Sequence, residues 1–156
     1  MKLTPSRLNT FLMLKLPSAW LCGVRVREID EEICRVKVTH RWINQNPFKS
    51  MYFAVQAMAA ELSTGALVMA KIKKENRKIS MLVAQNAASF SKKATGKITF
   101  TCGDGHKIDA AIQRTLETGE GQTFWMNSKG FNEEGVEVSS FKFEWTVKVK
   151  REFNEH

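Results

Sequence analysis

The chain has 156 residues, of which 43% are hydrophobic and 26% charged, and its net charge is +8. A chain of this length can bury a core of its own, so we expect residues 1–156 to form a single domain. The net positive charge favours ligands that carry phosphate, although a charge of this size is also common in small domains, where it serves only solubility. The three cysteines form no C-x-x-C pair, which argues against a disulfide scaffold and for reduced thiols.

The first element that the pattern predicts is an amphipathic helix over residues 4–16. Leu8, Phe11 and Leu12 fall at helical spacing, and Pro17 ends the pattern. Charged and polar residues interrupt this apolar run, which is not typical of a secretory signal. We therefore expect a cytoplasmic protein.

Two strands, a connection and the longest helix are expected next. The alternation of apolar and polar residues indicates the strands, and an Asn-Pro pair breaks the connection. The expected ranges are 23–28 and 33–40 for the strands, 41–51 for the connection and about 52–72 for the helix.

Four more strands and one short helical insertion complete the pattern. The expected strands are 80–90, 97–102, 122–129 and 136–150, with the helix at about 108–116. Runs of strands with a single long helix predict an α+β fold in which a curved antiparallel sheet wraps around that helix.

Glu61 is the strongest functional candidate among the individual residues. It is the one charged residue between Tyr52 and Ala70, in a stretch that is otherwise neutral. A carboxylate on an apolar helix is costly to bury unless it is paired, protonated or used. The alternative is a structural carboxylate that is hydrogen-bonded inside the core or to a partner subunit.

Other kinds of site have little support in the sequence. The three histidines are not spaced to bind one metal ion, so we expect no metal. The sequence also has no nucleophile elbow and no phosphate-binding glycine loop. The aromatic residues do not alternate with basic ones, so we expect no nucleic-acid partner. A protein that binds nucleic acid through its basic surface is the weaker alternative. Gln56 and Glu61 interrupt the apolar helix, so we expect no membrane partner either.

Three stretches resemble the hot-dog fold thioesterase superfamily. Asn46 precedes the long helix, and residues 58–65 are similar to the acidic-x-x-x-Gly pattern of phenylacetyl-CoA-type and hydroxybenzoyl-CoA-type thioesterases. Residues 88–98 resemble the strand-turn-strand of that superfamily, in which a Phe, basic residues and a Gly recur. With its extra N-terminal helix, the chain is most similar to the branch of domains of unknown function. The resemblance implies a hot-dog fold.

The resemblance also implies hydrolysis of an acyl-CoA-type thioester without a cofactor. Glu61 would be the general base or nucleophile, Asn46 would position the carbonyl or water, and N–H groups near Met51–Phe53 would hold the oxyanion. Lys92 and Lys93 lie in a turn of the sort that contacts the phosphates of coenzyme A. The expected substrate-binding residues are Lys92, Lys93, Met51, Tyr52, Phe53, Gln56 and Thr64.

The resemblance implies a homodimer, or a dimer of dimers, with sites at the interface. Glu61 of one subunit would face the Lys92-Lys93 turn of the same or the other subunit. One departure concerns the helix start, where these thioesterases usually carry a Gly-rich turn and this chain has bulkier residues at 49–53. Glycine lets the backbone approach a thioester closely, so a non-catalytic acyl-CoA-binding protein is the alternative.

Overall fold

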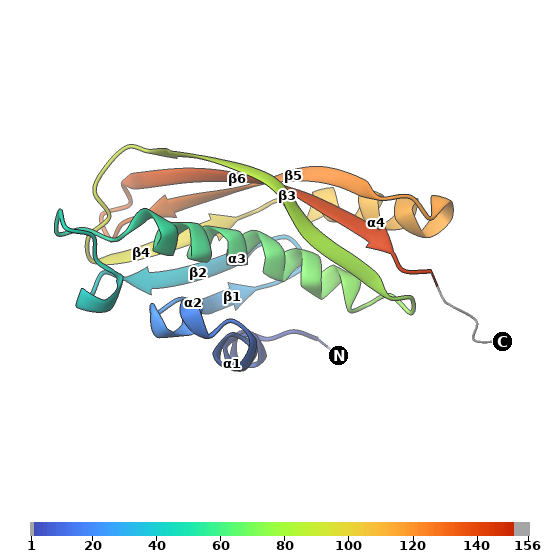
Figure 1. The fold of residues 1–156 in the computed structure, drawn as a ribbon, viewed down its shortest axis with the longest axis horizontal. Helices are drawn as coiled ribbons and strands as arrows, with labels where there is room; N and C mark the ends of the chain where they lie inside the picture. The colour runs from blue at the N-terminus through green and yellow to red at the C-terminus, as the bar shows by residue number, and fades with distance from the viewer. Residues whose placement is uncertain (1, 152–156) are drawn as a thin grey trace.

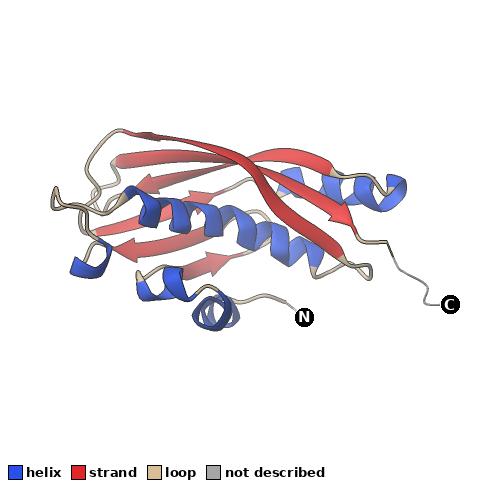
Figure 2. Ribbon diagram, in the orientation of Figure 1, coloured by secondary structure: helices blue, strands red, loops and turns tan. Residues whose placement is uncertain are grey.

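The computed structural model describes residues 2–151, in which one antiparallel sheet curves around a long helix (Figures 1 and 2). The strands are β1 (Arg25–Ile29), β2 (Cys34–Thr39), β3 (Ile79–Phe90), β4 (Lys97–Cys102), β5 (Gln122–Phe131) and β6 (Glu137–Val149). The helices are α1 (Pro5–Lys15), α2 (Pro17–Leu21), α3 (Phe53–Ile72), α4 (His106–Thr118) and the 3-10 turn η1 (Trp42–Asn44). The expected α+β architecture and its long central helix are confirmed.

The strand order in the sheet is β1-β2-β4-β5-β6-β3. β3 is one edge of this sheet, although it pairs with β6 along almost its whole length, from Ile79 opposite Val149 to Phe90 opposite Ser139. The second half of β3, residues 84–90, is exposed along its length. A long edge strand of this kind carries backbone groups that remain free to pair.

The hydrophobic core lies between α3 and the concave face of the sheet. Strand residues alternate between the core and solvent, as in β6, where Phe141, Phe143 and Trp145 are buried. The apolar side of α3 meets them through small residues such as Ala59 and Ala66, which allow a close approach. By length and composition alone α3 could cross a membrane, but most of it is buried inside this fold, so it is a core helix.

Two short helical segments were not expected from the sequence. Pro17 ends α1 as predicted, but it also begins α2, because proline is well suited to the first position of a helix. The connection before α3 contains η1, which the side chain of Asn44 fixes by donating to the carbonyl oxygens of Cys22 and Thr39, both at 2.9 Å. α1 packs on β1, and α2 packs against α1.

Candidate functional site

A groove with a volume of about 510 Å³ lies where the 46–52 loop enters α3. The loop and the first turns of α3 form one wall, and the turn after β3 forms the other. The groove gathers seven of the residues predicted as site residues, namely Asn46, Met51, Tyr52, Phe53, Gln56, Lys92 and Lys93. Segments that are about 40 residues apart in the sequence therefore meet in one surface feature.

The loop wall is held together by the side chain of Asn46. Its Oδ1 accepts from the backbone N–H of Phe48 at 2.9 Å, and its Nδ2 donates to Oγ of Ser50 at 2.9 Å. Lys49 adopts a positive φ of 59°, a conformation that side-chain-bearing residues seldom take. The side chain of Asn46 therefore makes its hydrogen bonds within the loop, as in an Asx turn, and shapes the groove wall.

The start of α3 leaves backbone donors free beside the groove. The N–H of Met51 donates to the carbonyl of Ala94 at 2.8 Å, and that of Tyr52 donates to the carbonyl of Asn44 at 2.9 Å. Within the described chain, the N–H groups of Phe53 and Ala54 have no acceptor. Of the N–H groups predicted near Met51–Phe53 as oxyanion donors, that of Phe53 is free, and the N–H of Ala54 is free beside it.

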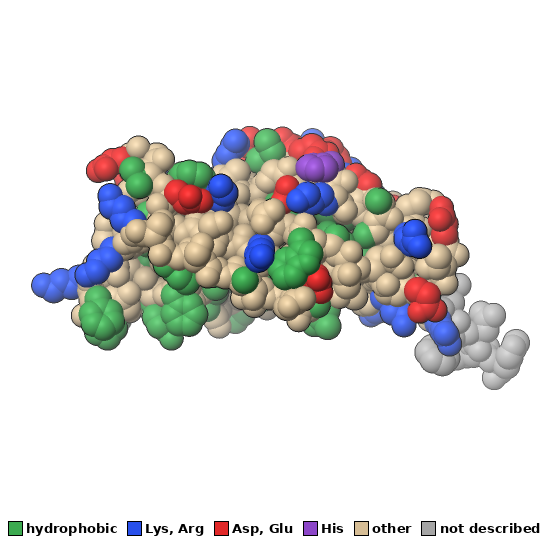
Figure 3. Space-filling view, turned by 90° about the horizontal axis from the view of Figure 1, so that it is seen from above, with side chains coloured by type: hydrophobic (Ala, Val, Ile, Leu, Met, Phe, Trp, Pro, Cys, Tyr) green, Lys and Arg blue, Asp and Glu red, His purple; other side chains and the backbone are tan. Residues whose placement is uncertain are grey.

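An aromatic wall lines the groove, and the sequence predicted Tyr52 and Phe53 in it but not Phe90 or Phe141. The rings of Tyr52 and Phe53 lie 5.0 Å apart, Phe53 and Phe90 lie 6.3 Å apart, and Phe90 and Phe141 lie 5.6 Å apart, each pair edge to face. The first three rings are exposed and Phe141 is buried, so the wall runs from the surface into the core. Figure 3 shows large hydrophobic side chains beside Lys and Arg at the end of the molecule where this loop lies.

The polar lining of the groove comes from three more predicted residues. Lys92 and Lys93 are both exposed, and Nζ of Lys93 donates to the carbonyl of Phe48 at 3.2 Å. Gln56 is buried, and its Oε1 accepts from the hydroxyl of Ser139 at 2.7 Å. Two cations at the rim and an apolar wall suit a ligand with one anionic end and one apolar end.

Glu61 lies further along α3, outside this groove. Its side chain is half-buried, no residue among 2–151 donates a hydrogen bond to its carboxylate, and burial raises its pKa above the ordinary carboxyl value. A Cβ on Gly65, one helical turn later, would lie 3.6 Å from Oε1 of Glu61 and 3.0 Å from the ring of Trp145. The missing side chain at Gly65 therefore makes the space in which carboxylate and indole approach each other.

Thr64, another predicted substrate-binding residue, does not line the groove. It is fully buried, and its hydroxyl donates to the backbone carbonyl of Glu61 at 2.8 Å. The same oxygen accepts from Nε1 of Trp145 at 2.9 Å. In a single chain Thr64 therefore makes a positioning contact, which holds the indole of Trp145, and its expected contact with a ligand stays a prediction.

In a single chain, the predicted site residues thus form two groups. Gln56, the last groove residue on α3, precedes Glu61 by five residues, which is about 7.5 Å along a helix axis. Between them, Ala57 and Met58 are half-buried on a side of α3 that the sheet leaves partly open. The acid and the groove share one helix, but they do not converge within one chain.

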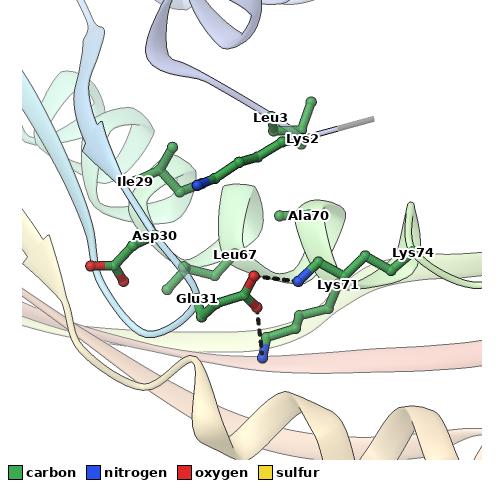
Figure 4. A pocket seen from close by; sticks show the side chains of 9 residues that line it. All are labelled: Lys2, Leu3, Ile29, Asp30, Glu31, Leu67, Ala70, Lys71 and Lys74. Carbon is green, nitrogen blue, oxygen red and sulfur yellow. Dashed lines mark hydrogen bonds and ion pairs between the residues drawn. The ribbon is translucent and has the colours of Figure 1, made fainter.

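A second cavity, of about 280 Å³, lies at the opposite end of α3 (Figure 4). There Glu31 binds the ammonium groups of Lys71 and Lys74, and Lys71 also binds Asp109 at 3.0 Å. These charges neutralise one another and connect the β1–β2 turn to α3 and α4. Within the described chain, no group of three His, Cys, Asp or Glu side chains is placed to hold a metal.

Comparison with known proteins places this architecture among hot-dog proteins. The profile of the family described as "Domain of unknown function (DUF4442)" matches residues 5–147. A protein of unknown function from Pseudomonas aeruginosa, described as a probable thioesterase, has a TM-score of 0.80 at 20% identity, covering 96% of this chain and 99% of its own.

Two further solved structures share the fold. A thioesterase from Haemophilus influenzae has a TM-score of 0.73 at 14% identity, covering 99% of this chain and 97% of its own. A protein of unknown function from Chlorobaculum tepidum has a TM-score of 0.81 at 15% identity, covering 96% and 99% respectively. A search of curated proteins gives no match. The hot-dog fold expected from the sequence is confirmed.

The burial of Glu61 predicts a pH-dependent effect of the Glu61→Gln substitution on stability. Because the folded-state pKa is raised, the folded protein binds this proton more tightly than the unfolded chain, and wild-type stability falls as the pH rises through that pKa. Glu61→Gln removes this loss, so the variant should melt above the wild type at pH 8, with a smaller gain at pH 4. Thermal melting across pH measures it, with the exposed Glu134→Gln as the matched control. An equal offset at both pH values would contradict the assignment.

Proposed function

The chain belongs to the DUF4442 family, and we propose that it hydrolyses acyl-CoA-type thioesters at two equivalent sites of a cytoplasmic homodimer. The observation that carries the proposal is the carboxylate of Glu61, half-buried and without a donor among the described residues. Structural carboxylates in cores are normally hydrogen-bonded or paired, so an unpaired one with a raised pKa is suited to accept a proton.

The proposed chemistry uses a water molecule as the nucleophile. Glu61 takes one proton from the water, whose oxygen forms a bond to the thioester carbonyl carbon. The carbonyl oxygen becomes negative and accepts hydrogen bonds from the free N–H groups of Phe53 and Ala54. The carbon–sulfur bond then breaks, and Glu61 returns the proton to the thiolate. Direct attack by the carboxylate, with an anhydride hydrolysed afterwards, remains the second route.

The groove is suited to the two ends of such a substrate. Lys92 and Lys93, which line the groove, would attract the phosphates of coenzyme A. The aromatic wall of Tyr52, Phe53 and Phe90 offers a surface for the acyl group or the pantetheine arm. No cofactor takes part in this scheme.

A second copy of the chain is proposed to bring Glu61 to the groove. The exposed half of β3 is free to pair with the same strand of a partner, and the partly open side of α3 lies beside it. In such a dimer, Glu61 of one subunit would face the groove of the other, which supplies Phe53, Lys92 and Lys93. The separation between acid and groove within one chain supports this shared arrangement.

Binding without turnover is the second candidate function, and the start of α3 favours it. The N–H groups of Met51 and Tyr52 already have acceptors, and Phe53 is a bulky residue in the segment where the thioesterases that the chain resembles usually carry glycine. A thioester carbonyl that does not reach these donors would be bound but not cleaved. Acyl-CoA that raises the melting temperature without being hydrolysed would favour this reading.

The loss of hydrolysis in Glu61→Gln tests the proposed function. The amide cannot accept the proton, so we expect turnover of acyl-CoA substrates to fall at least about a hundredfold. Release of free thiol from a panel of short, long and aromatic acyl-CoA substrates measures the rate, and Glu134→Gln serves as the matched control. Turnover that survives in Glu61→Gln would reject Glu61 as the catalytic group.

Replacing Lys92 and Lys93 together by alanine tests the coenzyme A end of the groove. We expect KM for an acyl-CoA to rise about tenfold, because two charge-assisted phosphate contacts are lost. The KM for the same acyl group on N-acetylcysteamine, which has no phosphate, should stay unchanged. Lys78→Ala with Lys148→Ala removes the same charge elsewhere on the surface. An equal rise in KM for both substrates would show that the two lysines do not bind the phosphates of coenzyme A.

A further inference from the structure

The N-terminal part of the chain has an unusual charge distribution. The first 27 residues contain two lysines, three arginines and no acidic residue. The first carboxylate is Glu28, which is paired with Arg35. Residues 2–27 therefore carry five positive charges and no negative one, against a net charge of +8 for the whole chain.

The same segment exposes an unusual amount of apolar surface. Leu14 is 66% exposed, Leu21 is 64% exposed and Trp42, the first residue of η1, is 82% exposed. Met13, Leu16 and Ile43 are exposed as well. Single exposed apolar residues are ordinary, but several of them on neighbouring elements are typical of an interaction surface.

These residues belong to one side of the molecule. α1 and α2 follow each other with only Leu16 between them, and Asn44 of η1 donates to the carbonyl of Cys22 at the end of α2 at 2.9 Å. Figure 1 shows α1 and α2 on the β1 side of the molecule, and the hydrogen bond from Asn44 joins η1 to the end of α2. We call this side the helical face, made of residues 5–21 and 41–43.

We propose that the helical face docks on the surface of an anionic lipid bilayer. Exposed leucines with a tryptophan and lysine or arginine side chains are the composition that lies in a membrane interface: the apolar groups enter the headgroup boundary and the cations meet lipid phosphates. The face offers Leu14, Leu21 and Trp42 for the first role, and Arg7, Lys15 and Arg41 for the second. This departs from the expectation of no membrane partner, and it concerns surface binding.

Charge complementarity separates this partner from two others. A second copy of the chain on the same face would bring two positive surfaces together, with no carboxylate in the first 27 residues to pair them. A nucleic acid would use the cations but would leave three large apolar side chains without a partner. A bilayer with anionic headgroups matches both the charge and the apolar groups.

The docking stands independently of the proposed hydrolysis, but it would place the groove near lipid. The carbonyl of Asn44 at the end of η1 accepts from the N–H of Tyr52 at 2.9 Å, so the helical face and the groove wall are joined by one hydrogen bond. A substrate with a long acyl chain collects at membranes, because each methylene adds about 0.8 kcal/mol of preference for the apolar phase.

Vesicle co-sedimentation of the full chain tests the docking. We expect binding to vesicles of phosphatidylcholine mixed with an equal amount of phosphatidylglycerol, and little binding to phosphatidylcholine alone. The combined change Leu14→Ser, Leu21→Ser and Trp42→Ser should lower the bound fraction at least about tenfold. Trp125→Ser, an exposed tryptophan on β5, is the matched control and should bind as the wild type does. Circular dichroism and melting verify that each variant is folded.

The charge contribution is tested in the same assay. Lys15→Glu should weaken binding to the anionic vesicles about tenfold, while Lys148→Glu, with the same charge change on β6, should have a much smaller effect. Absent binding to anionic vesicles, or equal binding by the triple variant and the wild type, would overturn the proposal. It would equally be overturned if the triple change converted a larger oligomer into a smaller one without lipid, which would show that a second copy covers the face.

Discussion

The proposed site depends on one constraint, the cost of keeping an unpaired carboxylate half-buried on α3. Glu61 has no donor among residues 2–151, and its desolvation raises its pKa. The surroundings maintain this state in a specific way, because Gly65 leaves room for the indole of Trp145, and Thr64 fixes that indole through a 2.9 Å hydrogen bond. An apolar ring beside the carboxylate offers no compensating donor to it, so the protein retains a base at a cost in stability.

The fold places this acid and the groove at different points of the same helix. α3 begins at the groove, where two N–H groups are free, and then runs under the sheet past Glu61. The sheet ends at β3, whose outer half is exposed and free to pair. A shared site between two copies would explain why the acid, the free donors and the two lysines occur in one chain without meeting in it. The proposed membrane face lies along α1, α2 and η1, away from that edge.

Local patterns were sufficient to predict most of the fold. Helix α3 and strand β4 lie within one residue of the ranges predicted, because a long apolar helix and alternating strands are local signals. The sequence also singled out Glu61 by contrast with its neutral surroundings. It did not reveal Trp145 beneath the carboxylate, Phe90 in the groove wall, or Cys34 opposite Cys102 on adjacent strands, because these contacts depend on strand register. Similarly, Thr64 has helical spacing for a contact with the carboxylate, but the nearer backbone carbonyl takes its hydroxyl proton.

Subunit complementation tests the shared site most directly. Phe53→Pro deletes one proposed oxyanion donor while keeping the helix start, since proline suits the first helical position and Tyr52 already has extended angles. Phe53→Pro and Glu61→Gln should each be inactive alone. Refolded together, they should recover about a quarter of the wild-type activity, because half of the dimers then carry one intact site out of two. Two inactive parents whose mixed dimers also stay inactive would contradict a site that is shared across the interface.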